Sequence, residues 1–227
     1  MNGSAVSTPP SSDPRRDAIL RHARSHFMSV GYAATRIEPI AREANVSTAT
    51  LYTYFAGKAD LFDAVIDDAA TDFIAHMQGV KSVSGSAREQ LVLFAETYGT
   101  FMGDPFVRSV FRLVMAERPR FKGVAMRFYE VGRQNFGAVL IDALQALCRS
   151  GQLKIEHPSW AASQLLGMVE HPVFFVSLVT GDEVKTQRSV PEIAADAVET
   201  FLSRYGVPGV SRPEPGPGPA GAVALKP

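Results

Sequence analysis

The fold is decided by residues 35–58, which read TRIEPIAREANVSTATLYTYFAGK. Thr35 and Glu38 have the spacing of a capping box, which predicts the start of a short helix. Asn45 follows at a point where the chain must turn, and Asn tolerates the left-handed backbone conformation better than most residues. Ser47 then caps a second short helix. Two short helices joined by a tight turn are the geometry of a helix-turn-helix.

The second short helix carries Leu51 and Phe55 on its inner side. At about 100° per residue, this orientation turns four other residues outward. They are Ala49, Thr50, Tyr52 and Thr53. Their small groups, hydroxyls and phenol suit close approach to base edges and phosphates. Positive charge for phosphates is available nearby from Arg36, Arg42 and Lys58.

The sequence on both sides of this motif is also patterned for helices. Asp13-Pro14 predicts the start of a first helix and Gly31 its end, with a stripe of Ile19, Ala23, Phe27 and Val30 between them. A fourth helix is expected from Gly57 to about Gly79. Further helices are expected near residues 87–102, 105–116, 120–150, 158–179 and 191–205. Almost no alternation of period two is present, so we expect an all-α fold.

This pattern divides the chain into four parts. Residues 14–60 form the helix-turn-helix domain, and residues 61–205 form a second α-helical domain. Residues 1–13 and 206–227 are rich in Ser, Pro and Gly. Such tails cannot bury enough apolar surface to offset the entropy of ordering them, so we expect both to be disordered.

Composition excludes several classes of protein. Of the 227 residues, 46% are hydrophobic and 20% are charged, which is typical of a globular protein. The single cysteine, Cys148, excludes a disulfide scaffold or a multi-cysteine zinc site, and its neighbours favour a small buried side chain over a redox sensor. The first residues lack the apolar core of a secretory signal. Residues 161–179 contain polar groups and Pro172, which disfavours a membrane span. We therefore expect a cytoplasmic protein without membrane contact.

Residues 16–66 resemble the N-terminal domain of TetR-type transcriptional regulators. The resemblance rests on Ile19, Ala23, Phe27, Gly31-Tyr32, Thr35, Ile40-Ala41, Ala44-Asn45-Val46-Ser47, Thr50-Leu51-Tyr52, Tyr54-Phe55, Lys58 and Leu61. The family usually has Gly where this chain has Asn45, and both residues reach the conformation of the turn.

The resemblance implies roles for particular residues. Thr48, Ala49 and Thr50 match the family's base-proximal positions. Its phosphate-contacting aromatic positions match Tyr52 and Tyr54, and its phosphate-contacting lysine matches Lys58. The family's hydroxyl at the start of the second helix matches Thr35, with Arg36 beside it. Periodicity separately indicates that Thr53 is exposed. The resemblance further implies a homodimer on double-stranded operator DNA and a small, largely apolar effector, with repression more expected than activation.

The second domain is expected to dimerise and to bind the effector. The helix from Pro158 is apolar on two sides, so one side should face the core and the other a second subunit, together with Phe201 on the last helix. Val173 lies on one of these apolar sides. Candidate effector contacts are Phe94, Tyr98, Phe111, Met115, Phe128, Gln164, Met168, His171 and Phe175. Residues 112–121, RLVMAERPRF, resemble the E-x-x-R-F-P segment of some efflux-type members, with the proline displaced.

Two other classes of function stay as alternatives. An enzyme is disfavoured because the sequence has no catalytic triad order, phosphate loop or metal-ligand cluster. A helical interaction module without DNA binding is disfavoured by the intact Tyr52, Tyr54 and Lys58. His22 and His26 lie four residues apart, but no third metal ligand is evident nearby. We therefore expect no cofactor and no bound metal.

Overall fold

The computed structural model describes residues 13–77, 85–184 and 186–208, and its regular elements within these ranges are all helices. Most of the two expected tails lies outside the described residues. The helices are α1 Pro14–Ala34, α2 Ile37–Glu43, α3 Thr48–Tyr54, α4 Lys58–Met77, α5 Ala87–Met102, α6 Pro105–Glu117, α7 Lys122–Gly132, α8 Ala138–Arg149, α9 Pro158–Glu170, α10 Val176–Thr180 and α11 Val190–Tyr205, with π-helical turns η2 Arg133–Gly137 and η3 His171–Phe175. The predicted all-α class is confirmed.

The first helix begins and ends where the sequence predicts. The Asp13 side chain accepts a hydrogen bond from the Arg15 amide, and Pro14 occupies the first turn. The regular helix breaks at Gly31, whose φ of 76° and ψ of 173° are not helical. Ile19, Ala23 and Phe27 are buried, but Val30 is 54% exposed. The predicted stripe is therefore one residue too long.

The predicted capping box at Thr35 and Glu38 is wrong. Helix α2 begins after Arg36 without a side-chain cap, and the buried Thr35 hydroxyl instead donates to the Gly31 carbonyl at 2.7 Å. Thr35 thus completes the end of α1. Reciprocal capping boxes do form at the starts of α5 and α11, through Ser86 with Glu89 and Ser189 with Glu192.

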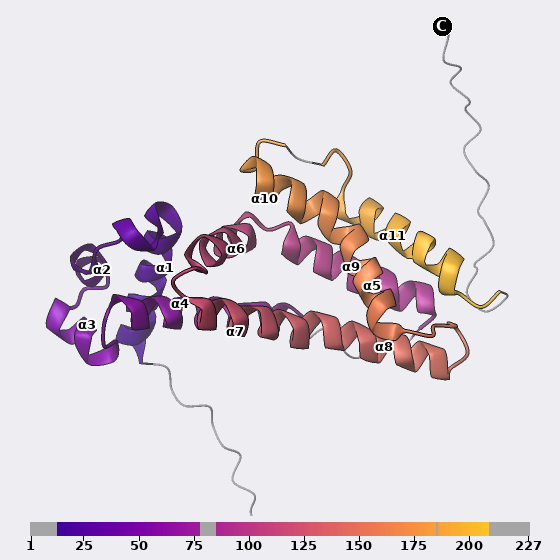
Figure 1. The fold of residues 1–227 in the computed structure, drawn as a ribbon, viewed down its shortest axis with the longest axis horizontal. Helices are drawn as coiled ribbons and strands as arrows, with labels where there is room; N and C mark the ends of the chain where they lie inside the picture. Colours follow the sequence, from indigo (N-terminus) through magenta and orange to yellow (C-terminus); the bar gives the residue numbers. More distant parts are fainter. Residues whose placement is uncertain (1–12, 78–84, 185, 209–227) are drawn as a thin grey trace, which may run out of the picture.

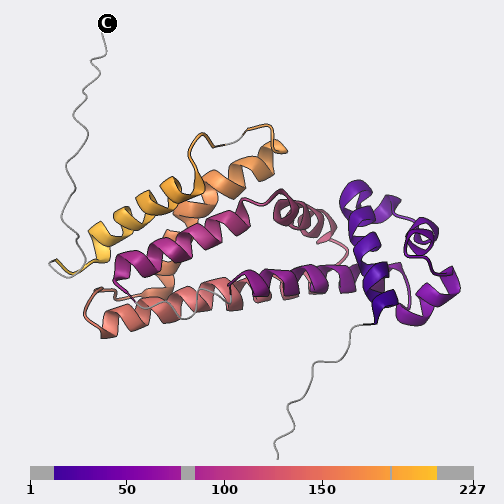
Figure 2. The same cartoon turned by 180° about the vertical axis from the view of Figure 1, so that it is seen from behind.

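Figure 1 shows α1–α3 gathered at one end of the molecule and the remaining helices at the other, with α4 between them. Seen from behind in Figure 2, α7 runs along α4, and these two helices are in contact. Helices α5, α9 and α11 pack on one another, and α8 packs on α9. The chain therefore links its helix-turn-helix to its second domain through α4, α6 and α7.

Two of the expected long helices contain π-helical turns. The helix expected over 120–150 starts at Lys122 and passes through η2 into α8. The helix expected over 158–179 passes through η3, which contains Pro172, into α10. A π turn holds an extra residue and often marks a functional position.

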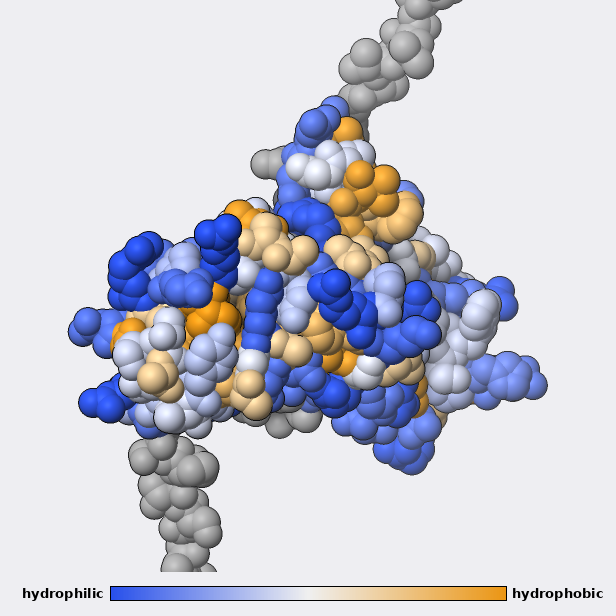
Figure 3. Space-filling view, turned by 60° about the vertical axis from the view of Figure 1, so that its left-hand side comes forward, coloured by the Kyte–Doolittle hydropathy of each residue, from blue (hydrophilic) through white to orange (hydrophobic). Residues whose placement is uncertain are grey.

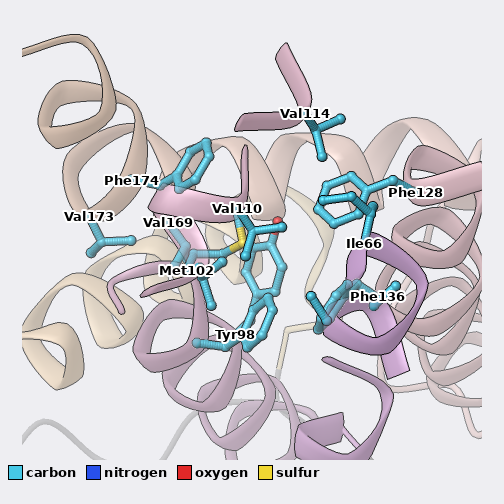
Figure 4. Close-up of a cluster of buried hydrophobic side chains, with 14 of the residues drawn as sticks. Ile66, Tyr98, Met102, Val110, Val114, Phe128, Phe136, Val169, Val173 and Phe174 are labelled. Atoms are coloured by element: carbon cyan, nitrogen blue, oxygen red, sulfur yellow. The ribbon is translucent and has the colours of Figure 1, made fainter. Parts of the chain in front are cut away.

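A core of apolar and aromatic side chains fills the second domain. Figure 4 shows Ile66 of α4 beside Phe128 and Phe136, so α4 contributes to this core. Tyr98 and Phe174 lie in the same cluster. The core is therefore shared between the helix that leaves the helix-turn-helix and the helices of the second domain.

Among the described residues, one helical stretch is long and apolar enough to cross a membrane by length and composition alone, and it covers 158–180. Ala161, Leu165 and Val169 of this stretch are buried in the second domain. Its other face carries exposed apolar side chains, including Trp160 (64%), Phe175 (53%) and Val179 (67%). Helix α9 also packs on α5, α8 and α11, as a core helix does.

Candidate DNA-binding site

Helix α3 is fixed at its first residue by local hydrogen bonds. Asn45 adopts a φ of 55°, as expected for the turn. The Ser47 hydroxyl caps α3 by accepting from the Thr50 amide at 3.0 Å, and it also lies 2.8 Å from the Thr50 hydroxyl. Leu51 is fully buried and Phe55 nearly so. The inner side of α3 is therefore held on the core, which sets the direction of its outer side.

The outer side of α3 carries no charged side chain and is exposed to solvent. Thr48, Ala49, Tyr52 and Thr53 are exposed, and Thr50 is half-buried. The Thr53 hydroxyl donates to the Thr50 carbonyl at 2.6 Å. Hydroxyls, a methyl group and a phenol thus form one surface, whose size and chemistry fit the edges of bases in a major groove.

Lys58 lies at the start of α4, and its ammonium group makes two hydrogen bonds within the protein. Its Nζ donates to the carbonyls of Ala33 (3.1 Å) and Thr35 (2.6 Å), and it lies 4.6 Å from the centre of the Tyr32 ring. Burial lowers the pKa of Lys58, and the nearby charge of Arg120 lowers it further. An ammonium group has three donors, so one remains for a phosphate.

Some of the other residues predicted to contact DNA have their polar groups bonded within the protein, and others are exposed. Tyr54 donates its hydroxyl to Asp13 at 2.6 Å, which ties α3 to the start of α1. This bond raises the pKa of Tyr54 and lowers that of Asp13. Arg36 is exposed, whereas Thr35 is 3% exposed and its hydroxyl is used internally. Arg36 and Tyr52 are thus the more accessible members of this set.

His22 and His26 both contact Glu43, a partner that sequence reasoning did not find. The distances to Glu43 Oε2 are 3.4 Å from His22 Nδ1 and 3.1 Å from His26 Nε2. Glu43 is the last residue of α2, so these contacts join α2 to α1. Within residues 13–77, 85–184 and 186–208, no group of three or more His, Cys, Asp or Glu side chains is placed to hold a metal.

The structure places the nine candidate effector contacts in different parts of the second domain, four of them in its interior. Four aromatic residues line the interior of the second domain: Phe94 and Tyr98 stack at 6.1 Å, and Phe111 meets Phe128 edge-on at 5.0 Å. Inside this cluster, the Tyr98 hydroxyl bonds to the carboxyl group of Glu170, and burial raises the pKa of that carboxyl. Sequence reasoning missed Glu170.

The other five candidates lie elsewhere, so the nine do not form one pocket. Met115 is 52% exposed on α6, and His171 stacks on Phe175 at 5.6 Å on the outer side of η3. Gln164 accepts a hydrogen bond from Tyr205 at 2.6 Å. Met168 lines a surface hollow between α9 and α11. His171 and Phe175 belong to the π turn η3, which the sequence pattern did not indicate.

Val173 and Phe201 were expected at a subunit interface, but the structure places them inside the chain's own core. They are 5% and 2% exposed. Exposed apolar side chains lie instead along the outer side of the helical stretch 158–180, at Trp160, Phe175 and Val179, and we call this surface the α9–α10 face. Figure 3 shows apolar side chains gathered toward the top of the molecule, at the height where Figure 1 places α10.

Two parts of this chain match described protein domains. Residues 19–65 match the family described as bacterial regulatory proteins, tetR family. Residues 89–207 match the C-terminal domain of AefR-like transcriptional repressors. Together these matches cover the helix-turn-helix and most of the second domain.

Relatives and solved structures agree with these matches. The HTH-type transcriptional regulator YhgD of Bacillus subtilis is 33% identical over 82 residues, which are 36% of this chain and 39% of that protein. The chain thus spans about two fifths of this curated relative. A TetR-family regulator from Mesorhizobium loti superimposes with a TM-score of 0.72 at 26% identity, covering 85% of this chain and 97% of the other. The flavonoid-responsive regulator FrrA gives 0.70 at 27% identity, covering 86% and 98%.

Proposed function

This chain belongs to the TetR family of bacterial transcriptional regulators, and we propose that it is a ligand-released repressor that binds a palindromic operator as a homodimer. The observation that carries this proposal is the uncharged, exposed outer side of α3, fixed by Ser47 and by the buried Leu51. In this proposal residues 14–60 bind DNA and residues 61–205 dimerise and bind the effector. The same assignment makes the protein cytoplasmic and a regulator without enzymatic activity.

The proposed division of labour on DNA follows from side-chain chemistry. Thr48, Ala49 and Thr50 face base edges, where small side chains allow close approach. Phosphates are bound by Tyr52, Thr53 and Arg36 on the exposed surface and by the third donor of Lys58. Tyr54 and Thr35 act by holding α3 and the α1–α2 turn in place. Residues 13–60 hold seven Lys or Arg and five Asp or Glu, so the attracting charge is local to this domain.

The α9–α10 face is proposed as the dimer interface, together with the adjoining surface of α11. Large exposed apolar side chains gather there, and such patches mark interaction sites. Pairing this face about a two-fold axis would present two α3 helices to successive turns of a duplex, roughly 34–36 Å apart.

The interior aromatic cluster is proposed as the effector site. Phe94, Tyr98, Phe111 and Phe128 supply apolar surface, and the Tyr98–Glu170 pair supplies polar groups within it. The likeness to a regulator named as flavonoid-responsive supports an effector of mainly apolar, ring-containing character.

Selection of bound duplexes from a random-sequence pool tests the DNA-binding proposal. We expect the protein to enrich an inverted repeat with half-sites about one helical turn apart. Replacing the exposed Thr48 with Ala should change the preferred base at one position per half-site and leave the salt dependence of binding unchanged, because this side chain faces a base edge. Failure to enrich any sequence would instead favour a helical interaction module.

Calorimetry tests whether the effector releases DNA. An aromatic compound found to bind should lose roughly 5- to 150-fold in affinity when the selected duplex is present, which corresponds to a coupling of about 1–3 kcal/mol. The coupling is reciprocal, so the compound should weaken DNA binding by the same factor. Equal affinities with and without the duplex would contradict ligand-released repression.

A further inference from the structure

The turn between α6 and α7 reaches the helix-turn-helix domain through two neighbouring residues. The Phe121 ring packs edge-on against Tyr32 at 4.8 Å, and it lies tilted against Phe62 at 4.7 Å. Arg120, directly before it, places its guanidinium carbon 5.1 Å from the centre of the same Tyr32 ring. Phe121 therefore anchors the turn on Tyr32 and Phe62, and this anchor brings Arg120 to the Tyr32 ring.

Two positively charged side chains thus lie beside the Tyr32 ring. Lys58 Nζ lies 4.6 Å from the ring centre and Arg120 5.1 Å from it. The charge of Arg120 acts on Lys58, and Glu117 opposes it in part. Two like charges held close together are unfavourable unless an anion lies beside them. A phosphate group of DNA is such an anion.

Arg120 also keeps its hydrogen-bonding capacity. Its side chain is exposed and lies over the Tyr32 ring, and it makes no hydrogen bond or ion pair with a side chain among the described residues. Several other arginines of the second domain are committed to carboxylates, including Arg108, Arg127 and Arg133. A guanidinium group has five donors in a planar fork that matches the oxygens of a phosphate.

We propose that Arg120 is a phosphate-binding residue that the second domain contributes to the DNA interface, beside Lys58. This inference rests on the proposed binding of operator DNA and extends that interface beyond the helix-turn-helix. It has a consequence for release: α6 contacts α1 and α4, and α7 contacts α4. A ligand that shifts the α6–α7 turn would withdraw a DNA contact directly, in addition to moving α3.

The experiment measures binding of the duplex selected by the wild-type protein, by fluorescence anisotropy across a series of salt concentrations. Replacing Arg120 with Gln removes one phosphate contact per subunit. The slope of log K against log salt should fall by about two units per dimer, at roughly 0.9 per contact. Affinity at 0.1 M salt should fall on the order of tens of fold. Arg120→Lys should keep most of the slope because it keeps the charge.

The control is Arg149→Gln, which removes the same charge from the last turn of α8, far from the helix-turn-helix (Figure 1). It should leave slope and affinity unchanged. If Arg120→Gln lowers affinity at an unchanged slope, Arg120 only supports the turn and the inference is overturned. An equal loss of slope in both variants would also overturn it, as a general effect of charge. If the wild-type protein selects no duplex, the proposed function fails first and the inference fails with it.

Discussion

Replacing Phe175 with Asp should convert the dimer into a monomer at micromolar concentration and lower operator affinity about 10²- to 10⁴-fold. The side chain is 53% exposed in one chain, so the substitution places a charge on the α9–α10 face without opening the core. The loss in affinity is large because the two half-sites are then bound independently instead of through one linked pair. Sedimentation velocity and anisotropy with the selected duplex measure the two effects.

The matched control for this prediction is Met126→Asp. Met126 is 63% exposed on α7, away from the α9–α10 face, and should tolerate the charge with no change in assembly or DNA binding. Val173 and Phe201 are unsuitable for this test because a charge at either site would be buried within the chain. A Phe175→Asp variant that remains dimeric with wild-type affinity would show that the subunits pair through another surface.

Replacing Asp182 with Asn should lower the free energy of unfolding by about 3 kcal/mol. Arg108 is 4% exposed, and its guanidinium group lies 2.6 Å from Asp182 and donates to the Gly103 carbonyl at 2.5 Å. Loss of the carboxylate leaves this buried charge without its counterion, which costs about 3–5 kcal/mol in buried pairs. The low end applies because Asp182 is partly exposed, at 27%. Urea denaturation measures the change.

The same pair predicts a pH dependence with a definite sign. Burial alone would raise the pKa of Asp182, but hydrogen bonds and charge from Arg108 and Arg112 outweigh it and hold that pKa below its ordinary value. The stabilisation is therefore fully present above the ordinary carboxyl pKa of about 3.9 and is lost as pH falls through the folded-state value. The difference between wild type and Asp182→Asn should be constant from neutral pH to about pH 5 and should shrink below about pH 4.

Glu130→Gln provides the control for this effect. The Glu130–Arg133 pair lies on the surface, and an exposed pair contributes little to stability. The arginine holds the pKa of Glu130 at about 2, yet the substitution should leave the unfolding midpoint unchanged. A midpoint that drops as far for Glu130→Gln as for Asp182→Asn would contradict the special role of the buried pair.

Sequence patterns predicted the helices and which side of α3 is exposed, because both depend on neighbours in the chain. Ser47, Asn45 and Leu51 act within one or two turns, and the structure places all three as expected. Contacts between distant residues were missed, such as those of Glu43 with His22 and of Arg120 with Tyr32. These depend on how helices pack, which no local spacing encodes. The capping box at Thr35 failed because packing on α1 gave its hydroxyl another partner.

The π turn η3 acts as a register shift within one continuous helix. Before it, Ala161, Leu165 and Val169 face the core, and Val173 and Phe174 within it and Ser177 after it do so as well. At about 100° per residue, a regular α-helix would have rotated the second group away from the first, and the extra residue of the π turn restores their alignment. Deleting one residue from η3 would therefore give a regular α-helix in which α10 still faces the core, whereas inserting one further residue would rotate α10 by about 100°. When relatives are aligned across this helix, a single-residue gap at η3 would mark a regular helix that still presents the same faces as this one.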